Sequence, residues 1–105
     1  SMVLHQTVVQ IGSSVGKHVI INTKASIDHD CIIENFVHIA PGSVLCGNVK
    51  VGEGTLIGAG STIMPNIKIG KWCTIGAGSV IIKDIPDYAV VVGNPGRIIK
   101  YNQHG

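Results

Sequence analysis

Aromatic and charged side chains are scarce in this 105-residue sequence, at 4% and 13% of the residues. So few aromatic residues suit a core that is too narrow for rings. The formal net charge is only +2, and no basic run with interleaved aromatics is present, which argues against nucleic-acid binding. Every apolar stretch is shorter than the roughly 20 residues that span a membrane, and we recognise no signal peptide. We therefore expect no membrane insertion and a cytoplasmic location.

Cysteine is also too rare for a disulfide framework, because the sequence has three and the number is odd. Cys31 and Cys73 fall at positions that we expect to face inward. Both are predicted to be reduced core residues of a cytosolic protein.

What the sequence has instead is an aliphatic residue at every sixth position, thirteen times in succession. These residues are Val9, Val15, Ile21, Ile27, Ile33, Ile39, Leu45, Val51, Ile57, Ile63, Ile69, Ile75 and Ile81. A period of six matches neither the helical period of about 3.6 nor the strand period of 2. It is typical of the hexapeptide repeat of a parallel β-helix.

Each hexad has its own corner. With the aliphatic residue as position one, positions five and one point inward because they are two residues apart on a strand, and positions six and two point outward. Position four often holds residues that tolerate a positive φ, namely Gly12, Asp30, Gly42, Asn48, Gly54, Gly60, Asn66, Gly78 and Asp84. Four exceptions at this position are expected to be strained or to use another corner geometry: His18, Lys24, Phe36 and Trp72.

Three hexads close one triangular coil of 18 residues, so thirteen hexads make a little over four coils, or about 20 Å of prism. We predict an all-β fold, a parallel β-helix of hexapeptide repeats, over residues 9–86. Residues 87–105 break the period and are expected to form an irregular C-terminal cap and tail. Residues 1–8, which begin with Ser-Met, are expected to be a tag remnant and a lead-in.

A histidine and an acidic residue share one corner. Asp30 can fix the tautomer of His29 while His29 acts as a general base, although the pair can equally be an ordinary solvated corner. His38 points outward from the face opposite that corner, and Asn22 lies on the same face one coil below. His29 can therefore meet Asn22 and His38 only across two copies of the chain.

Two further corners are candidates for binding a thiol arm. The stacked segments 58–60 and 76–78 each read Gly-Ala-Gly, and their small side chains let a flexible arm such as pantetheine approach closely, unless the glycines only turn the chain. Cys46 precedes Gly47, which stacks over His29, so a Cys-His nucleophile pair is also conceivable.

Two other kinds of protein share this architecture. The γ-class carbonic anhydrases bind zinc through three histidines at a subunit interface, whereas His29 and His38 are nine residues apart on opposite sides of a coil. A non-catalytic prism, such as one that binds ice, would need regular outward threonine rows. Both remain alternatives, and we expect no metal site.

Residues 20–100 resemble the NeuD/PglD group of sugar acetyltransferases, hexapeptide-repeat proteins with a left-handed β-helix. The resemblance rests on the motifs INT, DHD, VHIAPGS, GNV, GAGS and GNP, read in this order. It implies that His29 is the catalytic base, that Asp30 orients it, and that His38 lines the acceptor and acetyl site. It also implies contacts to acetyl-CoA at Asn22, Gly47, Ala59 and Ala77.

The resemblance further implies the reaction and the assembly. Acetyl would pass directly from acetyl-CoA to an amine or hydroxyl of a sugar, nucleotide-linked, in bacterial surface-glycan synthesis. The enzyme would be a homotrimer with its active sites between subunits, and no metal would be required. Family members usually carry an N-terminal Rossmann-like domain, which this sequence does not show. The domain is therefore expected to have been removed, or the chain to be the end of a longer fusion, or the chain to work alone.

Overall fold

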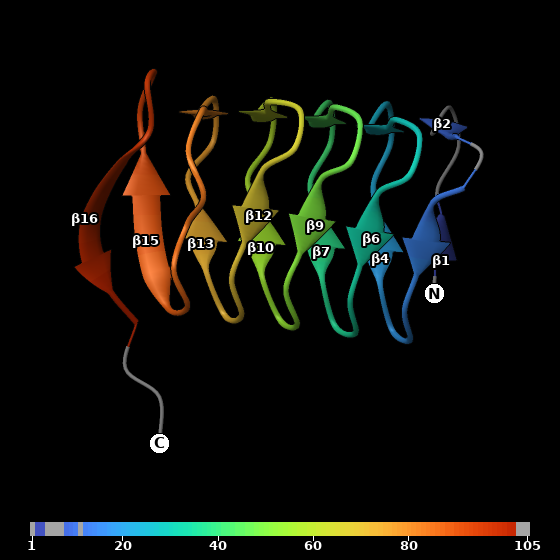
Figure 1. Cartoon of the computed structure of the whole chain (residues 1–105), viewed down its shortest axis with the longest axis horizontal. Coiled ribbons are helices and arrows are strands. Elements are labelled where there is room, and N and C mark those ends of the chain that lie inside the picture. The colour runs from blue at the N-terminus through green and yellow to red at the C-terminus, as the bar shows by residue number, and fades with distance from the viewer. Residues whose placement is uncertain (1, 4–7, 11, 103–105) are drawn as a thin grey trace.

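A computed structural model describes residues 2–3, 8–10 and 12–102 of the chain. Short strands stack into three sheets that form the faces of a triangular prism (Figure 1). Face A contains β1 (Met2–Val3), β4 (Ile20–Ile21), β7 (His38–Ile39), β10 (Leu56–Ile57), β13 (Thr74–Ile75), β15 (Ala89–Val92) and β16 (Arg97–Tyr101). Face B contains β2 (Val8–Val9), β5 (Ser26–Ile27), β8 (Val44–Leu45), β11 (Thr62–Ile63) and β14 (Val80–Ile81). Face C contains β3 (Ser14–Val15), β6 (Ile32–Ile33), β9 (Lys50–Val51) and β12 (Lys68–Ile69).

The coil repeats every 18 residues. On face A, Ile21 pairs in parallel with Ile39, Ile39 with Ile57, and Ile57 with Ile75. Faces B and C keep the same register. The predicted all-β fold, a left-handed β-helix of hexapeptide repeats, is confirmed.

The core is a column of inward side chains. Position-one aliphatic residues from Ile21 to Ile81 are at most 2% exposed. Cys31 and Cys73 are buried free thiols, as predicted. The buried hydroxyls of Ser43, Thr55 and Ser61 donate to backbone carbonyls at distances of 2.7–3.0 Å. Small polar residues are thus accommodated because each hydroxyl finds a partner.

From Gly12 to Gly78, the corners share one geometry at position four, whatever residue occupies it. His18, Lys24, Phe36 and Trp72 have φ values of 54–63°, like the glycines and asparagines. These four residues therefore carry the expected backbone strain, and the alternative of a different corner geometry is wrong. A left-handed backbone conformation costs about 1–2 kcal/mol for a residue with a Cβ.

Asp84 is a corner that we predicted wrongly, because it does not adopt a positive φ. Above β12, the last strand of face C, the backbone pairs only through Ile85, which forms a parallel bridge with Ile69. Oδ1 of Asp84 accepts a hydrogen bond from the backbone N–H of Lys68 at 2.9 Å, and Oδ1 of Asp87 accepts one from Lys71 at 2.8 Å. Two side-chain carboxylates thus supplement the single backbone bridge at the end of face C.

Face A continues where the hexads end. β15 pairs in parallel with β13, with Val91 opposite Ile75, a spacing of 16 residues rather than 18. β16 then returns antiparallel to β15. β1 pairs with β4 at the other end. Face A therefore has seven strands (Figure 1) and the longest dimension of the molecule is 32 Å, which exceeds the predicted height of the hexads alone.

Candidate active site

The candidate base occupies the corner between faces B and C. His29 and Asp30 follow β5, and Nδ1 of His29 lies 3.3 Å from Oδ2 of Asp30. When Nδ1 carries the proton and donates it to the carboxylate, Nε2 is left with the lone pair that a general base needs. The two side chains are 58% and 62% exposed, so the pair contributes little to stability and remains accessible to a substrate.

Two residues that the sequence did not single out hold this pair in place. The backbone N–H of His29 donates to Oδ1 of Asp28 at 2.7 Å. A Cβ at Gly12, one coil below, would collide with Oδ1 of Asp30, so the glycine makes room for that carboxylate. The 18-residue spacing of Gly12 and Asp30 was the available signal, since position-four residues stack.

Gly47 lies directly beside the imidazole, in the coil above. A Cβ at this buried glycine would lie 2.8 Å from Nε2 of His29 and 2.7 Å from Cε1. Real Cβ atoms do not approach other atoms so closely, so the ring occupies the volume that a side chain at position 47 would fill. The stacking predicted from the coil period is present, and it sets where Nε2 can lie.

Asn22 and His38 form a second cluster, which lies on face A and its corner with face B. Nδ2 of Asn22 lies 2.6 Å from Nε2 of His38. With the amide donating, Nε2 accepts and the proton of His38 resides on Nδ1. In the strand register, His38 lies between Ile20 and Leu56, whose side chains are 37% and 39% exposed. This histidine therefore has an apolar setting on an outward face.

The two clusters lie on different parts of the prism. His29 belongs to the corner between faces B and C, whereas His38 lies on face A, which is opposite that corner. No loop interrupts the coils between them. One chain thus presents each half of the candidate site in a different direction.

The corner between faces A and B carries the two Gly-Ala-Gly segments. Ala59 and Ala77 are exposed, and a Cβ at Gly60 or Gly78 would meet no atom within 4 Å. The backbone N–H groups of Gly60 and Gly78 donate hydrogen bonds to the carbonyl oxygens of Pro41 and Ala59, in the coil below each. These two amides are therefore not directed outward, and what the corner offers is an open surface for close approach.

Cysteine and metal chemistry receive little support from the geometry. Burial first, and then the negative charge of Asp28, raise the pKa of the Cys46 thiol, which disfavours the nucleophilic thiolate. Within residues 2–3, 8–10 and 12–102, no group of three or more His, Cys, Asp or Glu side chains is arranged to hold a metal ion. The same residues include no helix of the length and hydropathy needed to cross a membrane.

Comparison with known proteins shows that the chain is similar to acyltransferases. Residues 48–83 match the family described as bacterial transferase hexapeptide (six repeats). A curated relative is the acyl-[acyl-carrier-protein]–UDP-N-acetylglucosamine O-acyltransferase of Stutzerimonas stutzeri, 30% identical over 104 residues, which are 97% of this chain and 40% of that protein.

Solved structures of acetyltransferases are also similar. Perosamine N-acetyltransferase from Caulobacter crescentus, as a variant with CoA and GDP-perosamine, has a TM-score of 0.87 at 32% identity, over 94% of this chain and 53% of that one. The acetyltransferase domain of PglB from Neisseria gonorrhoeae, with acetyl coenzyme A, has a TM-score of 0.79 at 31% identity, over 92% and 56%. Serine acetyltransferase of N. gonorrhoeae has a TM-score of 0.89 at 28% identity, over 94% and 43%.

This chain therefore spans about half the length of the proteins that it matches, and the shared part is the β-helix. The predicted resemblance to sugar acetyltransferases is confirmed by two of these structures. The repeat and the three-faced prism together identify the chain as a hexapeptide-repeat β-helix protein, and the proteins to which it is similar are acyltransferases.

Proposed function

We propose that this chain is the catalytic β-helix of an acetyltransferase that moves acetyl from acetyl-CoA to an amine or hydroxyl of a sugar, nucleotide-linked, in bacterial surface-glycan biosynthesis. The observation that carries the proposal is the exposed His29, whose Nδ1 faces Asp30 and whose Nε2 lies against a residue without a side chain. The similar proteins that bind CoA or acetyl-CoA support the cofactor. A cytoplasmic location, where acetyl-CoA is made, agrees with three free cysteines.

The proposed reaction is a direct transfer. Nε2 of His29 accepts the proton of the acceptor amine or hydroxyl as that group attacks the thioester carbonyl carbon. The C–S bond then breaks, and the proton passes from His29 to the sulfur of CoA. Asp30 stabilises the imidazolium formed between these two proton transfers. The backbone N–H of Gly47 is our candidate for the group that stabilises the oxyanion.

A homotrimer completes the site. Because His29 and His38 of one chain face apart, a cleft that contains both needs two subunits, with His29 from one and Asn22 and His38 from the other. Three-fold symmetry repeats this heterologous contact and closes the ring. Each trimer then has three equivalent clefts, with His38 beside the acceptor and Asn22, Gly47, Ala59 and Ala77 along acetyl-CoA.

The acceptor class is decided by an assay. The full-length gene product, supplied with acetyl-CoA, should acetylate a nucleotide-linked amino sugar in preference to the free sugar, and should leave L-serine unmodified. Release of free CoA thiol gives the rate, and mass spectrometry of the product separates N- from O-acetylation. Acetylation of serine alone would mean that the acceptor is an amino acid and not a sugar, in keeping with the similarity to serine acetyltransferase.

The cofactor surface is tested by steric block. Ala59→Tyr and Ala77→Tyr should each weaken acetyl-CoA binding at least tenfold, about 1.4 kcal/mol, because a ring there fills the open corner. The melting temperature should change little, since both side chains point to solvent. Calorimetry measures the affinity. Glu53→Tyr is the matched control, at the same coil and hexad position as Ala59 but at another corner. Normal acetyl-CoA binding by both Ala59→Tyr and Ala77→Tyr would show that acetyl-CoA lies elsewhere.

A further inference from the structure

The corner between faces A and B carries one charged residue, Lys24. The segments of this corner that the structure describes are 22–25, 40–43, 58–61 and 76–79, and no other residue in them is charged. On face A, the outward residues of the strands from β4 to β13 are Ile20, His38, Leu56 and Thr74. Lys24 is therefore the one formal charge that the described part of the chain places along its own side of the proposed cleft.

The backbone at Lys24 disfavours a lysine. Position four of this corner holds Lys24 in the coil of Asn22 and glycine in the three coils above it, and all four residues have a positive φ, 62° at Lys24 and 68–72° at the glycines. A residue with a Cβ is strained in this conformation, whereas glycine is not. Strain of this kind is found where a side chain has a function, which points to a role for the side chain of Lys24.

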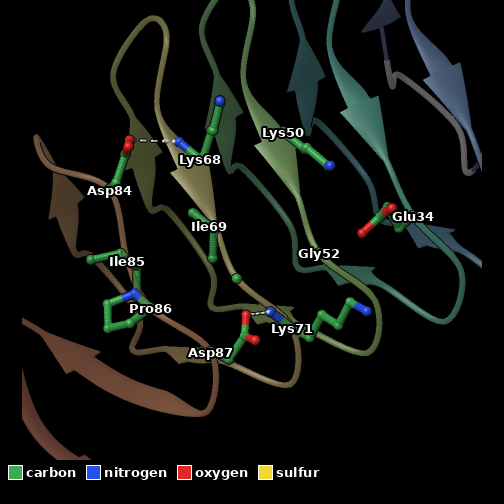
Figure 2. A pocket seen from close by; sticks show the side chains of 11 residues that line it. Glu34, Lys50, Gly52, Lys68, Ile69, Lys71, Asp84, Ile85, Pro86 and Asp87 are labelled. Atoms are coloured by element: carbon green, nitrogen blue, oxygen red, sulfur yellow. Dashed lines mark hydrogen bonds between the residues drawn. The ribbon is translucent and has the colours of Figure 1, made fainter.

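The other cations of the chain lie elsewhere on the prism. Figure 2 shows Lys50, Lys68 and Lys71 around a pocket on face C, where Glu34, Asp84 and Asp87 supply carboxylates. Lys17 lies at the corner between faces C and A, Lys83 at the corner between faces B and C, and Arg97 and Lys100 on β16. Lys24 is exposed, and among the described residues its ammonium group has no ion-pair partner. An anion at the corner between faces A and B would therefore meet Lys24 and no other cation of the same chain.

Lys24 lies at the acceptor's end of the proposed cleft. It is two residues from Asn22, whose Nδ2 lies 2.6 Å from Nε2 of His38, so the Cα atoms of Asn22 and Lys24 are within about 7 Å of each other. In the proposed trimer this corner lines the cleft, and acetyl-CoA follows it upward from Asn22 to Ala77. The acceptor is left the space below, which the flexible stem of Lys24 can reach.

The phosphates of acetyl-CoA are too far from this lysine to be its partner. Gly78 lies three coils above Lys24, about 14 Å away at about 4.8 Å per coil. Those phosphates are at the opposite end of the pantetheine arm from the acetyl group, and hence at this level or beyond it. An anion beside Lys24 would therefore belong to the acceptor.

We propose that Lys24 binds the diphosphate of a nucleotide-linked acceptor and makes the enzyme prefer this acceptor to the free sugar. The inference rests on the proposed acetyl transfer and names the residue that selects its acceptor. A lysine ammonium is a point charge on a flexible stem, which suits binding to a phosphate group. The competing partner is a carboxylate of the neighbouring subunit, whose corner between faces B and C lies across the cleft.

Binding of nucleoside diphosphates tests Lys24 without any acetyl transfer. UDP and GDP are titrated by calorimetry into this 105-residue chain at saturating CoA, and at least one should bind at millimolar concentration or below. Lys24→Asn should weaken that binding at least tenfold, because it removes a charge-assisted hydrogen bond, and Lys24→Arg should retain most of it. Lys17→Asn, which removes the same charge at another corner of the prism, is the control and should bind normally. No binding by the wild type, undiminished binding by Lys24→Asn, or equal weakening by Lys17→Asn would overturn the proposal.

Kinetics on the full-length gene product test the selection of the acceptor. With the nucleotide-linked sugar, Lys24→Asn should raise KM at least tenfold with little change in kcat. With the free amino sugar, which carries no phosphate, its KM should equal that of the wild type. An equal rise in KM for both sugars would overturn the proposal, and so would weaker binding of acetyl-CoA, which would assign the lysine to the cofactor.

Stability separates a ligand site from a subunit contact. The melting temperature of Lys24→Asn should stay equal or rise, because asparagine tolerates a positive φ. A lower melting temperature or a dissociated trimer would show that Lys24 pairs with a carboxylate of the neighbouring subunit, which would overturn the proposal. No transfer to any sugar, beside UDP or GDP binding that depends on Lys24, would instead contradict the proposed function and leave the phosphate site in place.

Discussion

Replacing His29 with alanine is expected to lower the turnover of the acetyltransferase by about 10² to 10⁴, the usual contribution of a general base. The imidazole is the group in its corner that can accept the acceptor's proton, and Asp30 lies on its Nδ1 side. Affinity for acetyl-CoA should change little, since binding does not need the proton transfer. Initial rates and calorimetry on the same preparations measure both quantities. Near-native turnover in His29→Ala would contradict the mechanism.

Two companion variants refine this expectation. Asp30→Asn should cost less than His29→Ala, because the imidazole remains present. Mixed trimers test whether the site is shared: His29→Ala and His38→Ala are each expected to be impaired, and random mixing of the two leaves about one cleft in four intact. Activity that reappears on co-expression requires two subunits per cleft. If activity does not reappear in trimers shown by mass spectrometry to be mixed, His29 and His38 are not contributed to one cleft by two subunits.

Gly47→Ala is expected to lower turnover by about 10²-fold without unfolding the coil. Gly47 does not need a positive φ, so alanine suits its backbone. The new methyl group would nevertheless fall 2.7–2.8 Å from Cε1 and Nε2 of His29, and the exposed imidazole must swing away. Misplacing a catalytic group by about 1 Å can cost 10²-fold in rate. Turnover should therefore fall, while the melting temperature should stay nearly unchanged.

A double-mutant cycle isolates the cause. In the His29→Ala background there is no imidazole for the methyl group to displace, so Gly47→Ala should add little further loss. Fully additive losses would mean that Gly47 acts independently of His29, for example through its own backbone N–H.

Much of the fold was predictable because one coil has one period. Ile21, Ile39, Ile57 and Ile75 pair with each other simply because eighteen residues separate them. The repeat period did not predict the C-terminal end of the β-helix, where the same residue type lies in a different environment. Asp84 looks like any other corner residue, but above β12 the backbone pairs only through the Ile85 bridge, and the Asp84 carboxylate accepts the N–H of Lys68. The extension of face A by β15 was equally hidden, because its spacing is 16 residues.

The candidate site was predictable where it depends on stacking and not where it depends on side-chain packing. The proximity of His29 and Gly47, and that of Asn22 and His38, follow from coil geometry. The part played by Gly12 was not recognised, because it depends on the direction in which the Asp30 carboxylate folds. The stacking of His18 on Phe36 was missed for the same reason. Whether these residues act as proposed is a matter for the assays.

Because each coil of the prism pairs only with the coils directly before and after it, chain length can vary in one way without disturbing the rest. Inserting or deleting a whole 18-residue coil beyond Gly47 shifts the C-terminal cap by one step and leaves every pairing around His29 unchanged. An insertion of six residues would instead rotate each later corner onto the next face, and the Gly-Ala-Gly corners would no longer lie above Asn22. Length differences among functional versions of this β-helix should therefore come in multiples of eighteen.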